Sequence, residues 1–300
     1  MIYKSQQPMI KMPYILTQML FSVVLIGSVV LFQCSTERDI STLLGSTSEG
    51  TIVVDAVLYV DRPMPEIIVS RTQSPESMPN DEHTGLNGAN VTVSQGLVTY
   101  QYRSTGNSGV YVPPEGAPSV LPETVYQLFI QVIGQEVRGS STTPGRLSLN
   151  EVVILDEGTQ GKLAQLDLPS PENNRVVYQE GLIEARFDPL EVDGYQVIVL
   201  EKSTGDTISS PPLEAPGGRL RLPWFALGSS GQHEIGLYAL DRNMFDVVRS
   251  IPRGENGFGI GSLAGDNFDR PIFNLQGAIG VFGSASVGSF GFEVLSKDVN

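Results

Sequence analysis

The sequence contains few of the residues that cross-links, metal sites and nucleic-acid binding require. Its 300 residues include one cysteine and two histidines. This excludes a disulfide framework and a cysteine zinc cluster, and it leaves a histidine zinc site short of ligands. Lysine and arginine total 19 against 33 aspartates and glutamates, so the net charge is −14. We therefore predict no nucleic-acid partner, because binding to the phosphate backbone depends on basic side chains.

Helical periodicity is also missing after the N-terminal segment. The chain holds 32 glycines and 20 prolines, which suit short strands joined by turns better than helices. Hydrophobic residues make up 40%, enough to bury a core. The composition therefore predicts an all-β globular protein, and its length suits two domains.

The N-terminus has the pattern of an export signal. Lys4 and Lys11 precede a stretch that carries no charge as far as Thr36 and is strongly apolar at its centre. Such a segment is a secretory signal or a membrane anchor rather than part of the fold. We predict a lipoprotein signal peptide at 1–33. Its removal takes away two lysines and no acid, so the net charge would fall from −14 to −16.

Cys34, the only cysteine, stands where the apolar stretch ends. A bacterial lipoprotein signal places its lipidated cysteine at this point, so Cys34 is the predicted acylation site and the predicted contact with the lipid bilayer. The residues just before Cys34 are bulkier than the small ones usual there. A single uncleaved transmembrane helix is the alternative reading, because the uncharged stretch is long enough to span a bilayer. The polar residues after Cys34 predict a flexible tether over 34–50.

Short segments of alternating polarity predict two Ig-like or fibronectin-III-like β-sandwich domains in tandem. We place them at 51–168 and 175–300, because 168–174 lacks apolar periodicity. Tyr195 and Tyr238 are predicted core aromatics. Strands are expected at 51–60, 66–70, 90–94, 97–103, 126–132, 183–187, 194–200, 219–222, 233–240 and 245–249. From Gly254 onward the chain is glycine-rich, and we assign no strand there.

No pattern in the sequence predicts a catalytic, cofactor-binding or metal-binding residue. His83 lies in a long polar segment and His233 begins a predicted strand, so neither is matched to a nucleophile. The run 257–261 has three glycines, but the sequence after it does not predict the helix that a phosphate-binding loop requires. The acidic loops 241–246 and 266–269 could supply part of a calcium shell, yet acidic turn residues more often bond their own backbone.

Several segments, in their order, resemble a Bacteroidota lipoprotein family catalogued as domain of unknown function 4249. They are Cys34, Thr51–Leu58, Ile68–Thr72, Asn87–Val93, Gly109–Tyr111, Tyr126–Leu128, Ser141–Pro144 and Asn274–Ser284. The resemblance implies an outer-membrane lipoprotein with Ig-like or fibronectin-like domains, often encoded near TonB-dependent receptors. It implies no activity and no functional residues.

From these features we expect a non-enzymatic binding or accessory module, held at the outer membrane by palmitate or a similar acyl chain on Cys34. A TonB-dependent receptor or another envelope protein is the expected partner, and the module faces the periplasm or the cell surface. Two alternatives stay open: a structural or adhesive envelope protein, and a secreted hydrolase with a carboxylate pair between the domains.

Overall fold

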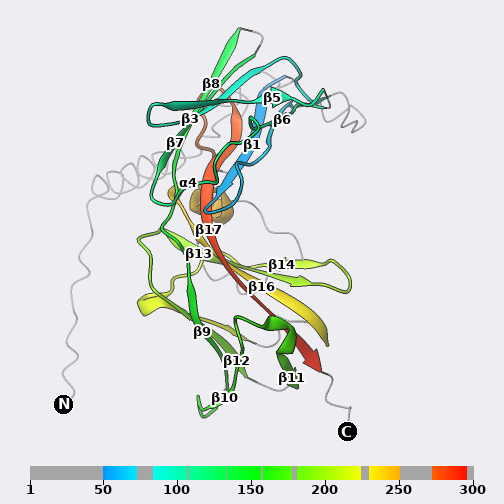
Figure 1. Ribbon diagram of the computed structural model, residues 1–300, viewed down its shortest axis with the longest axis vertical. Coiled ribbons are helices and arrows are strands. Elements are labelled where there is room, and N and C mark those ends of the chain that lie inside the picture. The colour runs from blue at the N-terminus through cyan, green and yellow to red at the C-terminus, as the bar shows by residue number, and fades with distance from the viewer. Residues whose placement is uncertain are drawn as a thin grey trace, which may run out of the picture. The chain divides into compact units, whose positions relative to one another are not determined.

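The computed structural model describes residues 50–72, 84–106, 108–132, 134–156, 158–177, 181–223, 230–250 and 272–295. All of them belong to one compact unit, Glu49–Asn300. Within these ranges the chain is mostly β-strand, arranged in three sheets (Figure 1). The predicted all-β fold class is confirmed.

The largest sheet has nine described strands, in the order β14-β13-β16-β17-β1-β2-β6-β5, with β11 paired to β17. Their bounds are β1 Ile52–Tyr59, β2 Ile67–Arg71, β5 Arg103–Ser104, β6 Val110–Val112, β11 Arg175–Val177, β13 Gly194–Glu201, β14 Thr207–Ser209, β16 Gly231–Leu240 and β17 Ile279–Leu295.

Two four-stranded sheets complete the β-structure that is described. One has the order β4-β3-β7-β8 and the other β10-β9-β12-β15. Their bounds are β3 Asn90–Gln95, β4 Val98–Gln101, β7 Val125–Val132, β8 Gln135–Thr142, β9 Leu149–Leu155, β10 Lys162–Gln165, β12 Leu182–Phe187 and β15 Arg219–Pro223. The short 3-10 turns η1 (Pro171–Asn173) and η2 (Pro216–Gly218) lie between strands.

Each four-stranded sheet shares a hydrophobic core with a different part of the nine-stranded sheet. The first core joins β1 and β2 to β3, β7 and β8, and it includes Leu58, Ile130 and Phe282. The second joins β13 and β16 to β9, β12 and β15, and it includes Ile235 and Phe290. Alternate residues of these strands face inward, which is the packing of a sandwich.

The 17-residue strand β17 contributes to both cores. It pairs in parallel with β1 up to Ala285, and from Ala285 onward it pairs antiparallel with β16. In Figure 1 it is the long red strand that extends from β1 to β16 and β11. Part of the glycine-rich sequence in which we assigned no strand, Ile279–Leu295, therefore forms the strand common to both cores. At Gly283 an added Cβ would lie 2.7 Å from Met244 Cγ, so a larger residue there would force the Met244 side chain of α4 to shift.

The cores do not follow the predicted domain boundary. Strand β9 precedes 168–174 but belongs to the second core, and Phe282 follows that segment but belongs to the first. The pairing of β17 with β1 and of β9 with β12 joins strands from opposite sides of that boundary. That 51–168 and 175–300 fold independently stays a prediction. Each hydrophobic core contains residues from both ranges.

Two tyrosines brace the turns that lead into their strands in the same way. Tyr126 OH accepts a hydrogen bond from the Leu121 N–H at 2.9 Å, and Tyr195 OH accepts one from the Leu190 N–H at 3.0 Å. Immunoglobulin-type sandwiches use such a tyrosine corner. Tyr195 is in the second core as predicted, but Tyr238 is not: it is half-buried and packs edge-on against another tyrosine.

The expected strand at 245–249 is wrong, because these residues belong to helix α4 (Arg242–Ser250). The Asp241 carboxylate caps the helix, accepting a hydrogen bond from the Met244 N–H at 2.8 Å. Asp246 then forms ion pairs with arginines one turn before and one turn after it, at 3.0 and 2.8 Å. Cap and ion pairs outweigh the strand preference of the two valines in this segment.

Candidate functional site

Several residues singled out from the sequence lie outside the described part of the chain. They are Cys34, His83, the glycine run 257–261 and the acidic loop 266–269. Acylation of Cys34 therefore stays a prediction.

His233 is packed inside the second core. Its side chain stacks on Phe292 with ring centroids 6.2 Å apart, and Nδ1 lies 3.0 Å from the Gly231 carbonyl oxygen. Only 1% of the residue is exposed. It serves packing and a local backbone contact rather than presenting an open ring nitrogen.

The acidic segment 241–246, predicted as a loop, is the cap and first turn of α4. Its Asp241 belongs to a buried polar node rather than a cation shell. Ser141 donates a hydrogen bond to Asp241 Oδ2 at 2.7 Å, and the Ser141 hydroxyl lies 2.8 Å from that of Ser284. Asp241 Oδ1 caps α4. Burial raises the pKa of the Asp241 carboxyl, although hydrogen bonds to it partly oppose the rise. Among the described residues no group of three or more acidic, histidine or cysteine side chains is placed to hold a metal.

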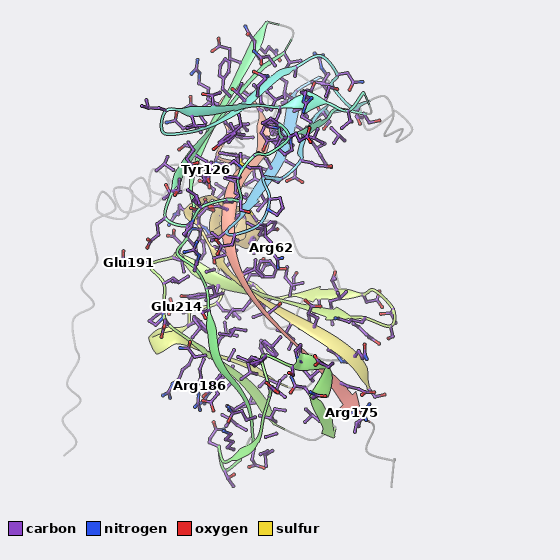
Figure 2. All side chains as sticks on the ribbon, in the orientation of Figure 1. Arg62, Tyr126, Arg175, Arg186, Glu191 and Glu214 are labelled. Atoms are coloured by element: carbon purple, nitrogen blue, oxygen red, sulfur yellow. The ribbon has the colours of Figure 1, made fainter. Side chains whose placement is uncertain are left out.

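A ladder of alternating charges crosses the sheet β10-β9-β12-β15. Lys162 pairs with Glu151 at 3.2 Å, Glu151 with Arg186 at 2.6 Å, and Glu184 with both Arg186 and Arg221 at 2.6 Å (Arg186 is labelled in Figure 2). The Glu184 side chain is 1% exposed. Burial pushes its pKa upward, but hydrogen bonds from the two arginines outweigh this and hold the pKa below its usual range. Each charged side chain of this ladder therefore has an oppositely charged partner within the protein.

A groove of about 350 Å³ opens beside β11, β16 and β17. Four of its charged lining residues are already paired, Arg175 with Glu293 at 3.0 Å and Lys202 with Glu234 at 2.9 Å, while Glu172 is exposed at its edge (Arg175 is labelled in Figure 2). The Asn174 amide hydrogen-bonds three backbone groups. A ligand in this groove would have to displace these internal partners.

The outer face of the sheet β4-β3-β7-β8 is different, because many of its hydrogen-bonding side chains point to solvent. Val93 and Leu128 face the core, so their neighbours along the strands face outward. Strand register places the outward residues in rows across the sheet. We call this surface the amide face; it comprises Asn90, Thr92, Ser94, Thr99, Gln101, Val125, Gln127, Phe129, Gln131, Glu136, Arg138, Ser140 and Thr142.

The amide face has one ion pair and otherwise no charge. Arg138 pairs with Glu136 at 2.9 Å and also lies over the Phe129 ring, 4.8 Å from its centroid. Gln127 and Gln131 are exposed, and no described residue hydrogen-bonds their carboxamides. These groups remain available to a ligand. The sequence predicted β3, β4 and β7 as strands and showed the alternation of glutamine with apolar residues in β7, but it did not predict β8.

Among the described residues, no helix has both the length and the apolar character needed to cross a bilayer.

The described sheets define an all-β protein of sandwich-like architecture, with an exposed polar sheet face as its candidate binding surface. The model of a family described as Domain of unknown function (DUF4249) matches residues 37–290, and the chain belongs to this family. The resemblance seen in the sequence is thus confirmed for the family. No curated protein matches the chain.

Proposed function

We propose that the protein is a non-enzymatic binding or accessory module of the cell envelope. The observation that supports this most is the amide face, where the exposed carboxamides of Gln127 and Gln131, which no described residue hydrogen-bonds, project from a sheet backed by a packed core. A rigid sheet presents such groups in a preformed arrangement, which lowers the entropic cost of binding. The partner we propose is a TonB-dependent receptor or another envelope protein.

The hydrolase alternative gains no specific support from the described carboxylates. Asp241, whose pKa is raised by burial, faces serine hydroxyls and the start of α4 rather than a second acid. A retaining or inverting glycosidase needs two carboxyl groups about 5 to 9.5 Å apart across an open cleft.

Co-purification tests the partner. The tagged full chain, extracted from its own membranes with mild detergent, is expected to retain a TonB-dependent receptor that mass spectrometry identifies. The same tag on an unrelated outer-membrane lipoprotein is the control. A chain that stays alone under these conditions would contradict the accessory role and favour the structural or adhesive alternative.

Cys34→Ser is expected to abolish incorporation of radiolabelled palmitate and to release the protein from the membrane fraction, because the acyl acceptor is lost. Ser35→Ala, one residue further on, is the matched control and should label like the native chain. Undiminished labelling of the Cys34→Ser variant would overturn the anchor. Loss of labelling with full membrane retention would instead favour an uncleaved transmembrane helix.

A further inference from the structure

We propose that the amide face binds an uncharged oligosaccharide. The proposal rests on the proposed binding function and names the ligand class of its surface, but it does not depend on acylation of Cys34. It follows from the charge, the hydrogen-bonding groups and the apolar content of the described face.

Charge is the first argument. The chain carries −14 overall, yet the amide face contains only Glu136 and Arg138, which neutralise each other at 2.9 Å. A nucleic acid or an anionic lipid surface needs an excess of basic side chains, and a cationic partner needs an excess of acidic ones. The face offers neither, so electrostatic complementarity selects a neutral ligand.

The hydrogen-bonding groups are the second argument. The carboxamides of Asn90 and Gln101 already bond to each other at 2.8 Å, so the groups open to a ligand are chiefly Gln127, Gln131 and the serine hydroxyls. A carboxamide offers two donors and an acceptor, and a hydroxyl can both donate and accept. Sugar hydroxyls have the same dual character, so these side chains can satisfy them in either direction. Gln127 and Gln131 stand on the same face of β7, and the hydroxyls of Ser94 and Ser140 flank Gln127 in the neighbouring strands. Adjacent strands lie about 4.8 Å apart, which gives a closely spaced array.

The limited apolar area is the third argument. Phe129, between the two glutamines along β7, is half-buried and has the Arg138 guanidinium over its ring. Protein interfaces centre on a larger cluster of aromatic and apolar anchors. The face adds to this ring only Val125, which is 49% exposed at the start of β7. One partly covered ring and one valine among amides and hydroxyls suit a polar ligand with small apolar patches, such as the faces of sugar rings.

The test uses the full chain in a polyoxyethylene detergent, which carries no sugar. Affinity electrophoresis is run through gels containing dextran, mixed-linkage β-glucan or galactomannan, with polygalacturonate as the anionic comparison. At least one neutral polysaccharide is expected to retard the protein, equally at low and high salt because no charge is involved. The double variant Gln127→Ala, Gln131→Ala is expected to bind that polysaccharide about tenfold more weakly, from the loss of two sets of hydrogen bonds.

Gln232→Ala is the matched control, since Gln232 is an exposed strand glutamine that lines the groove beside β16 instead. It is expected to bind like the native chain, and circular dichroism should show that all variants fold. Three results would each overturn the proposal: no retardation by a neutral polysaccharide, equal retardation of the double variant, or loss of retardation only in Gln232→Ala. If a receptor still co-purifies in any of these cases, the binding function stands and only the ligand class fails.

Discussion

Gly280→Ala is expected to lower the free energy of unfolding by about 3 kcal/mol, the sum of backbone strain and overpacking. Gly280 has φ +113°, a conformation that L side chains rarely adopt, and an added Cβ would lie 2.0 Å from the Val54 carbonyl oxygen. Relief requires β17 to move away from β1, to which Gly280 is paired. Because β17 belongs to both cores, the damage should reach the whole unit. Urea denaturation followed by circular dichroism measures the change.

Gly88→Ala is the control that separates the cost of backbone strain from the cost of a steric collision. Gly88 has φ +82°, but nothing lies within 4 Å of an added Cβ. Its substitution should cost only about 1 kcal/mol, from strain alone. If Gly280→Ala were no more destabilising than Gly88→Ala, the close approach of β1 and β17 would be contradicted.

Asp241→Ala is expected to lower the free energy of unfolding by about 3 kcal/mol at neutral pH. The variant loses the cap of α4 and leaves the buried Ser141 hydroxyl without its carboxylate acceptor. Asp206→Asn, in an exposed turn, is the control and should change stability by less than about 0.5 kcal/mol. Urea denaturation of both variants provides the comparison, and equal small effects would contradict the role of the node.

Asp241→Asn tests the same node through its pH dependence. Burial raises the pKa of Asp241 in the folded protein, so the folded state holds its proton to higher pH than the unfolded chain does. This contribution to stability is therefore complete below the usual pKa of 3.8 and is lost as pH rises through the folded pKa. Asparagine does not titrate, so the stability of the variant relative to the native protein should rise across that window. A difference that is constant with pH, or that falls, would show that the carboxylate is not penalised by burial.

Local alternation was enough to predict about half of the described strands; those it did not predict are β6, β8, β9, β10, β11, β14 and β17. In β7 every second residue from Tyr126 is buried, as predicted, because a strand places successive side chains on opposite faces. The same alternation identified Ile183 and Phe187 as core residues. It also placed Glu184 on the side of the strand opposite the core, but it did not predict that two arginines would bury this side chain. One of those arginines comes from β15, and a local pattern contains no information about a strand that distant.

The misassigned elements show where local patterns fail. The two valines of helix α4 led to the prediction of a strand. The helix begins at Asp241, whose carboxylate caps it and also accepts a hydrogen bond from buried Ser141. Strand β17 is rich in glycine, which disfavours strands, yet the backbone of β1 leaves no room for a Cβ at Gly280. In β17 tertiary contacts overrode propensity, whereas in α4 a local cap and ion pairs one turn apart outweighed it.

The sequence predicted only part of the candidate site. Gln127 and Gln131 could be placed opposite the apolar face of β7 from the sequence alone. Their neighbours on β3 and β8 join them only through strand register, which depends on how the pairs Thr92–Phe129 and Phe129–Arg138 align. Register could therefore not be read from any one segment.

The sequence by itself determined that the protein is acidic, all-β and a member of its family, because composition, period-two alternation and ordered motifs are local properties. Only the tertiary structure decided which strands share a core, that β17 joins β1 to β16, and that a neutral polar face lies across four strands. The pairing of Asp55 with Val281 illustrates the reason. Contacts so far apart in the chain form when two buried surfaces fit together, and neither segment encodes that fit alone.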